Sequence, residues 1–164
     1  MTRKSVAGMV LVTALSAIAS TQAAEDNPHQ GSAMHHMTMQ SEDTRELVHF
    51  PGPLREHELA NMRNHLLTLY KIELALSHRE FDEASRLAEH RLGLSSLGMH
   101  GAHEVAPYMP KGMQDIGMQM HRAASRLAVE VNTSAATGDM RPALAALAHV
   151  TAQCVACHVA YRLQ

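Results

Sequence analysis

Cys154-Val155-Ala156-Cys157-His158 is the stretch that decides how the rest of the sequence is interpreted. On a helix, Cys157 and His158 lie three and four residues after Cys154, so the three side chains leave one face. This spacing predicts a c-type haem attachment site, in which the thiols form thioethers with the haem vinyl groups and His158 binds the iron. The sequence contains no other cysteine.

Three other interpretations of this motif are a zinc half-site, a dithiol redox pair and a plain disulfide. Zinc needs a second pair of ligands with similar spacing, and a thioredoxin-like dithiol sits near a βαβ pattern, which this sequence lacks. Because only six residues follow His158, we expect any second axial ligand to come from upstream. The preceding residues then have to enclose the haem.

The beginning of the chain has the features of a secretory signal. Two basic residues precede an apolar run over residues 6 to 19, and small residues end the segment at Ala23-Ala24. The apolar run is too short to span a membrane comfortably, so residues 1 to 24 are predicted to be a cleaved signal, with an uncleaved anchor as the alternative. Export to an oxidising compartment follows from this prediction.

Residues 25 to 50 lack helical periodicity and are rich in Gln, Ser, His and Met, which predicts a disordered lead-in. Within it, residues 34 to 39 read MHHMTM. Thioether and imidazole groups suit copper, and thioethers suit Cu(I) in particular. We favour a solvated tail over a copper site for this segment, and copper handling remains a second alternative function.

Residues 51 to 164 are predicted to form one all-α domain, an antiparallel four-helix bundle with the haem on the C-terminal helix. The helices are expected at residues 53 to 78, 80 to 94, 111 to 135 and from Pro142 onward. No strand pattern competes with them. On the last helix, Leu144, Leu147, Thr151, Cys154 and His158 keep a spacing of three or four residues, so the haem is expected inside the bundle.

Two further patterns concern the interior of this bundle. Leu59, Met62, Leu66 and Leu69 form the expected apolar face of the first helix. The longest connection, residues 98 to 110, is broken by prolines and glycines. Its histidines and methionines, His100, His103 and Met109, can approach a metal, but we favour a packed loop with exposed histidines. The methionines of the third helix are expected to be core filler.

The terminal CxxCHxxYR pattern, from Cys154 to Arg162, together with the first helix around Met62, resembles the cytochrome c prime family and its low-spin relatives of the cytochrome c-556 type. The resemblance covers roughly residues 53 to 164. It implies that His158 is the proximal iron ligand, that Cys154 and Cys157 anchor the haem, and that Arg162 lies near it. Arg162 can instead serve as an ordinary partner of the helix dipole.

The sixth iron position separates the two branches of this family. In the electron-transfer branch a methionine of the first helix closes the iron, whereas the gas-binding branch places a non-ligating apolar residue there. Met62 stands at about the family position, so we expect Met62 as the distal ligand; methionine opposite histidine raises the reduction potential. His65, one turn away, and the absence of any sixth protein ligand are the alternatives.

The resemblance therefore implies a periplasmic monohaem cytochrome of a Gram-negative bacterium, with haem c as its cofactor and other periplasmic redox proteins as partners. No catalytic constellation is evident, so we expect an electron carrier rather than an enzyme. The gas-binding alternative takes nitric oxide or carbon monoxide. Family members often pair through the first two helices, so a homodimer is plausible. The net charge of −2 gives no reason to expect nucleic acid binding.

Overall fold

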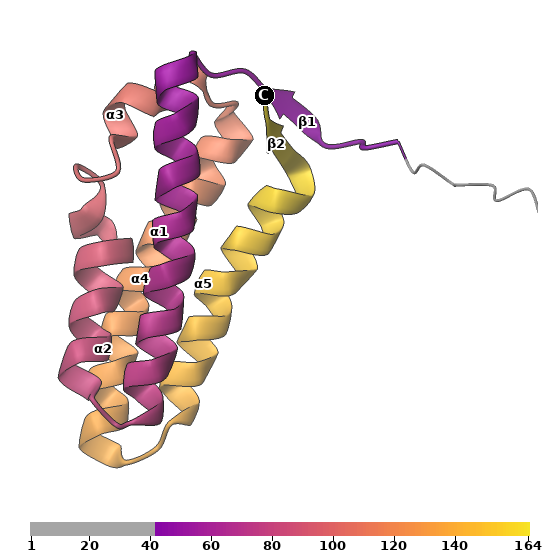
Figure 1. The fold of residues 1–164 in the computed structure, drawn as a ribbon. Helices are drawn as coiled ribbons and strands as arrows, with labels where there is room; N and C mark the ends of the chain where they lie inside the picture. Colours follow the sequence, from indigo (N-terminus) through magenta and orange to yellow (C-terminus); the bar gives the residue numbers. More distant parts are fainter. Residues whose placement is uncertain (1–41) are drawn as a thin grey trace, which may run out of the picture. The chain divides into compact units, whose positions relative to one another are not determined.

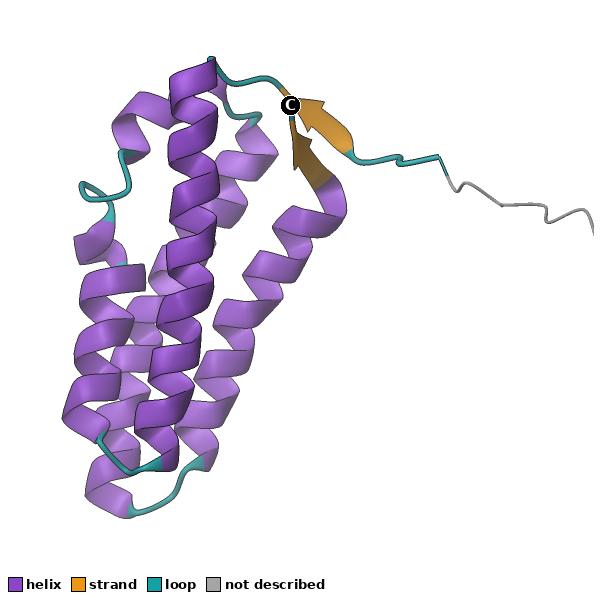
Figure 2. Ribbon diagram, viewed as in Figure 1, coloured by secondary structure: helices purple, strands orange, loops and turns teal. Residues whose placement is uncertain are grey.

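The computed structural model describes residues 42–164, which are mostly helical (Figures 1 and 2). Five helices pack together: α1 Gly52–Ser77, α2 Phe81–Leu87, α3 Ala102–Val105, α4 Lys111–Thr137 and α5 Arg141–Ala160. The predicted signal, the MHHMTM motif and most of the predicted lead-in lie outside the described residues.

The helix boundaries agree with those expected from the sequence. Pro53 and Pro142 stand in the first turns of α1 and α5, where proline loses no hydrogen bond. The second helix is regular only to Leu87 and then widens into a π-helical segment, Ala88–Leu92. The connection after it contains short 3₁₀ turns and α3, as its prolines and glycines predict.

The main hydrophobic core joins the C-terminal half of α1, α2 with its π-helical continuation, the middle of α4 and the N-terminal half of α5. The most extensive packing is between α4 and α5. The largest fully buried apolar side chains of this core are Ile72, Leu92, Leu127, Val131 and Val150.

A second, smaller apolar cluster lies near the start of α1. Two short strands, β1 Glu46–Val48 and β2 Tyr161–Leu163, pair in parallel with Glu46 opposite Tyr161. Val48 and Phe50 are buried there against Val105. Residues 46–50 were expected to be disordered, and no strand was expected in the chain. Both expectations are wrong here, because residues 46–48 form a strand and Val48 and Phe50 are buried. The strand pairing depends on residues at the far end of the sequence, which local periodicity does not register.

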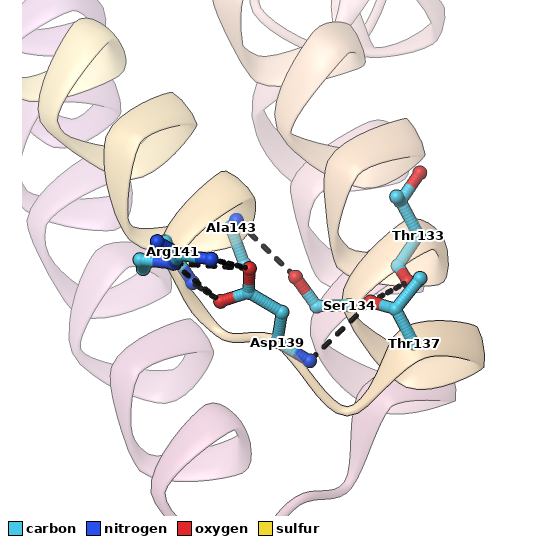
Figure 3. Close-up of polar contacts among 6 residues, drawn as sticks. All are labelled: Thr133, Ser134, Thr137, Asp139, Arg141 and Ala143. Carbon is cyan, nitrogen blue, oxygen red and sulfur yellow. Dashed lines mark hydrogen bonds and ion pairs between the residues drawn. The ribbon is translucent and has the colours of Figure 1, made fainter.

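The turn between α4 and α5 is held by polar contacts (Figure 3). Gly138 ends α4 in the left-handed conformation with φ 76°, which glycine adopts without a steric penalty. The fully buried Ser134 accepts a hydrogen bond at 3.3 Å from the backbone N–H of Ala143 in the first turn of α5. An ion pair of 2.7 Å between Asp139 and Arg141 closes the turn on its exposed side.

The buried face of α1 differs from the one expected. Over residues 58 to 68 of α1 the buried side chains are Glu58, Asn61, His65 and Thr68, whereas Leu66 of the expected apolar face is 71% exposed. Both faces have the same three-and-four spacing and are adjacent on the helix. The polar face continues the stripe that buries Ile72, so tertiary packing, not hydropathy, selects it.

A similar shift occurs on α5. The helix packs through Ala143, Ala146, Leu147 and Val150, while Leu144 is 54% exposed. Of the expected stripe, Leu147 is buried and Cys154 packs against the core, whereas Leu144, Thr151 and His158 are exposed. From residue 151 to residue 160, no α5 side chain is buried.

Candidate functional site

The two thiols and His158 lie on the last turns of α5. Cys154 and Cys157 are partly buried and neither forms a disulfide. Burial raises the pKa of the Cys154 thiol, and burial with the negative charges of Cys154 and Glu58 raises that of Cys157. Both groups are therefore thiols at neutral pH. His158 is exposed on the same side of the helix.

A cavity of about 350 Å³ joins these groups to α1 and α4. Both thiols and His158 line it from α5, and Met62 lines it from α1. In Figure 1, the C-terminal end of α5 diverges from α1. Cys154, Cys157 and His158 belong to this end of α5. The remaining lining is mostly apolar and consists of Arg63, His65, Leu66, Leu69, Ile116, Gly117, Met120 and Gln153.

A second cavity, of about 300 Å³, shares Met62, Gly117, Cys157 and His158 with the first. It is distinguished by three guanidinium groups in its lining, those of Arg45, Arg55 and Arg162. Gly117 of α4 is common to both cavities, and a Cβ atom added to it would meet nothing within 4 Å. Open space therefore extends along α5 beside the thiols.

Arg162 lies in β2, beside this second cavity. Its Nε is 3.5 Å from Asp43 Oδ2, yet this buried atom has no hydrogen-bond partner within residues 42–164. Asp43 is bound more closely by Arg45, whose hydrogen bond lowers the pKa of the Asp43 carboxyl to about 2. The Arg162 side chain is partly exposed, but its buried Nε–H is left without an acceptor beside His158 within the described chain. Buried N–H groups normally have an acceptor.

The two candidates for the sixth ligand, Met62 and His65, lie in different environments. Met62 is partly buried and lines both cavities that contain His158. His65 reaches only the first of them, is buried, and directs Nε2 to His100 Nδ1 at 3.4 Å. Both residues therefore share a cavity with His158, but Nε2 of His65 already faces His100.

Three histidines that are far apart in the sequence lie close together in the interior. All three are buried: His65 lies on α1, His100 in the connection before α3, and His121 on α4. The ring centroids are 4.5 Å apart for His65 and His100, 5.5 Å for His100 and His121, and 6.3 Å for His65 and His121. The expectation of an exposed loop histidine is wrong for His100 and agrees with the exposed His103. The sequence contains one signal for the burial of His65: Ile72, Thr68 and His65 are spaced by four and three residues, so they share one face of α1.

No group of three or more His, Cys, Asp or Glu side chains in residues 42–164 is placed to hold a metal ion. This includes His158 and the two thiols, so the thiols do not form a protein-only metal site there.

By length and composition alone, α5 is also apolar enough to cross a membrane. A mostly buried core helix meets the same criteria, whereas 22% of the apolar window of α5 is buried, on the face that packs against α4.

No family model matches this chain, and it matches no curated protein and no solved structure. Its function is therefore inferred from the residues and cavities described above.

Proposed function

We propose that this protein is a periplasmic c-type cytochrome with one haem, which carries electrons between redox proteins. In this proposal α1, α2, α4 and α5 form an antiparallel four-helix bundle that encloses the haem beside α5. The observation that carries the proposal is the 350 Å³ cavity, in which Cys154, Cys157 and His158 share a lining with Met62 of another helix.

The residues of this cavity fit a haem in three respects. Its lining is mostly apolar, as a porphyrin requires. It continues past Gly117 into the second cavity, where a side chain would otherwise stand. The two cysteines are free thiols on one face of a helix. Each can add across one vinyl group, with sulfur bonding one carbon and the thiol proton passing to the other, so nothing leaves.

A haem held there supplies an iron centre that gains and loses one electron. The protein's part is to hold His158 and Met62 in fixed positions on separate helices. Both are neutral ligands, so neither takes up a proton when the charge of the iron changes. An unchanged pair of ligands in the two redox states keeps the structural change on electron transfer small.

The arginines of the second cavity support the same proposal. Haem carries two propionate groups, and carboxylates form strong hydrogen bonds with guanidinium groups. Arg45, Arg55 and Arg162 line one cavity with His158, and Arg162 Nε lacks an acceptor within the described chain. We assign Arg162 to haem binding on this basis, with Arg45 and Arg55 beside it.

The test is an optical and resonance Raman spectrum of the ferric and ferrous protein, with and without carbon monoxide. Electron transfer through a closed haem predicts low-spin iron, a methionine charge-transfer band and no reaction with carbon monoxide. Met62→Ala should convert the iron to high-spin. Met118→Ala is the matched control because Met118 lines neither cavity that contains His158.

Gas binding is the second candidate function. Leu66 and Leu69 line the same cavity as His158, and apolar side chains over an iron leave its sixth position free for a neutral diatomic ligand. High-spin iron that binds carbon monoxide in the unmodified protein, with a spectrum unaffected by Met62→Ala, would replace electron transfer with this function.

A homodimer is part of the proposal as well. Helix α1 exposes Leu67, Tyr70 and Leu74, and large apolar side chains that cluster on a surface often mark an interface. Sedimentation velocity at several protein concentrations measures whether two copies associate, and Tyr70→Glu should shift the equilibrium toward the monomer.

A further inference from the structure

A third cavity, of about 310 Å³, contains the buried histidines and belongs to neither role proposed for the haem. His65, His100 and His121 line it together with Glu58 and Asn61. It shares Met62, His65, Gly117 and Met120 with the first haem cavity, and Glu58, Met62, Met109 and Gly117 with the second. Exposed Asp115 also lines it, so the cavity reaches solvent.

Two imidazole nitrogens face each other across this cluster. His65 Nε2 and His100 Nδ1 are 3.4 Å apart. Two nitrogens that each lie about 2.0 Å from one ion at a tetrahedral angle are about 3.3 Å apart. A direct hydrogen bond between the two rings is long at this distance, whereas the spacing matches a shared cation.

The third ring has a fixed tautomer. His121 Nδ1 donates a hydrogen bond of 2.7 Å to the carbonyl oxygen of Leu92, so the lone pair of the neutral ring is on Nε2. Histidines that bind metals commonly donate their other N–H to a carbonyl in this way. His121 thereby adds a second electron-rich edge beside the His65 and His100 pair.

The position of His100 is held independently of its side chain. Its carbonyl oxygen accepts hydrogen bonds of 3.0 Å from Asn61 Nδ2 and from His57 Nε2. Both donors come from α1, which also carries His65. The backbone of His100 is thus held by contacts outside the pair, and Ser96 Oγ lies 3.4 Å from its Nδ1, which favours the preorganisation of this side of the site.

The imidazoles are neutral at pH 7, so their lone pairs are available. Burial, reinforced by the neighbouring rings, lowers the pKa of His65 to about 3 and that of His100 to about 4. Burial also lowers the pKa of His121. Glu58, buried in the same lining, offers a carboxylate that can balance one positive charge.

The sulfur content of the lining selects the metal. Met109, Met118 and Met120 line the cavity in addition to Met62. Thioethers bind Cu(I) and are rarely zinc ligands, while imidazole suits copper and zinc alike. Within residues 42–164 no three His, Cys, Asp or Glu side chains are placed to hold an ion, so the methionines that line this cavity are the candidates for a third donor.

We propose that this cavity binds Cu(I) through His65 Nε2, His100 Nδ1 and a methionine thioether of its lining. The site lies outside the predicted MHHMTM copper motif, and one of its ligands, His65, also lines the cavity proposed for the haem. Binding involves no electron transfer and, since both rings are already neutral, displaces no proton from a charged imidazole.

The test measures Cu(I) retained by the full-length protein, in ascorbate under nitrogen, against a competing chromophoric Cu(I) chelator. The parent protein and all variants also carry Met34→Leu, His35→Gln, His36→Gln, Met37→Leu and Met39→Leu, so that the MHHMTM motif contributes little. We expect one bound Cu(I) per chain, and an affinity reduced on the order of 100-fold by His65→Gln or by His100→Gln, since even outer contacts to ligands are worth 10-fold to 100-fold. His103→Gln, an exposed histidine of the same connection, is the matched control.

Two further measurements keep the test valid if a histidine variant folds poorly. Cu(I) should raise the melting temperature of the parent protein, because a ligand that binds only the native state stabilises it. Leucine replaces Met62, Met109, Met118 or Met120 in four separate variants that preserve side-chain volume, and one of them should remove the sulfur signal from the copper X-ray absorption spectrum. Equal Cu(I) affinity in the parent protein and in both histidine variants would overturn the proposal, as would a copper spectrum without sulfur.

Discussion

The buried imidazoles make the stability of this protein sensitive to mild acid. His65 and His100 have pKa values of about 3 and 4 in the folded chain, against about 6.5 in an unfolded one. The unfolded state therefore binds more protons below pH 6.5, and the free energy of unfolding falls as the pH drops from there toward the folded pKa values. At pH 5 both rings are still neutral in the folded state.

The size of this effect follows from the pH difference alone. Between pH 6.5 and pH 5 each ring loses about 2 kcal/mol of stabilisation, at 1.36 kcal/mol for each pH unit. The pair therefore costs about 4 kcal/mol, which is large against the ~5–15 kcal/mol that stabilises a typical domain. Asp43 does not contribute in this range, because its carboxyl is ionised in both states at pH 5.

The assay is urea unfolding at pH 8 and at pH 5, without added metal, followed by circular dichroism. The parent protein should lose about 4 kcal/mol at the lower pH, whereas His65→Gln and His100→Gln should each lose about half as much. His121, whose pKa is also lowered, adds in the same direction. Glu58 acts in the opposite direction because burial raises its pKa, and Glu58→Gln measures that contribution.

The exposed His103 provides the control for this prediction. His103→Gln should keep the full pH dependence of the parent protein, since His103 lies on the surface. If the parent protein is equally stable at the two pH values, or if His103→Gln reduces the dependence as much as His65→Gln does, then the buried cluster is not its source.

Three other predictions concern α4. Ser134→Ala leaves the buried N–H of Ala143 without its acceptor and should cost about 1–2 kcal/mol in urea unfolding; exposed Thr133→Ala should cost less. Gly138→Ala places a side chain at φ 76° and should cost about 1 kcal/mol by the same measurement; an unchanged midpoint would mean that the turn relaxes freely. Gly117→Phe occupies the open space beside the thiols and should lower the ratio of haem to protein in a pyridine haemochrome assay, whereas Gly117→Ala should retain it; equal haem content in both variants would argue against haem in this cavity.

The helices could be predicted from the sequence because their signals are local. Pro53, Pro142 and Gly138 mark ends that depend only on neighbouring residues, and the structure has helices where these signals place them. The strands β1 and β2 could not be predicted in this way. Each has three residues, and each exists because a partner from the other end of the chain lies beside it.

The interior of the candidate site was harder to predict than its ends. The motif on α5 identified Cys154, Cys157 and His158 from spacing alone, and the haem assignment remains a prediction. The buried face of α1 was misassigned because hydropathy ranks Leu66 above His65, although packing buries His65. His100 and His121 join it from distant positions, and a single histidine in a loop or helix carries no information about such neighbours.

The parallel pair of β1 and β2 has a consequence for the order in which the chain folds. Contacts within the α1–α2 and α4–α5 hairpins connect residues close in sequence, whereas Glu46 and Tyr161 are nearly the whole described chain apart. Closing so long a loop costs the most chain entropy, so non-local pairing of this kind forms late. We therefore expect the last turns of α5, which carry Cys154 and Cys157, to be held loosely until the strands pair. The end of the described chain is then the last part to become fixed.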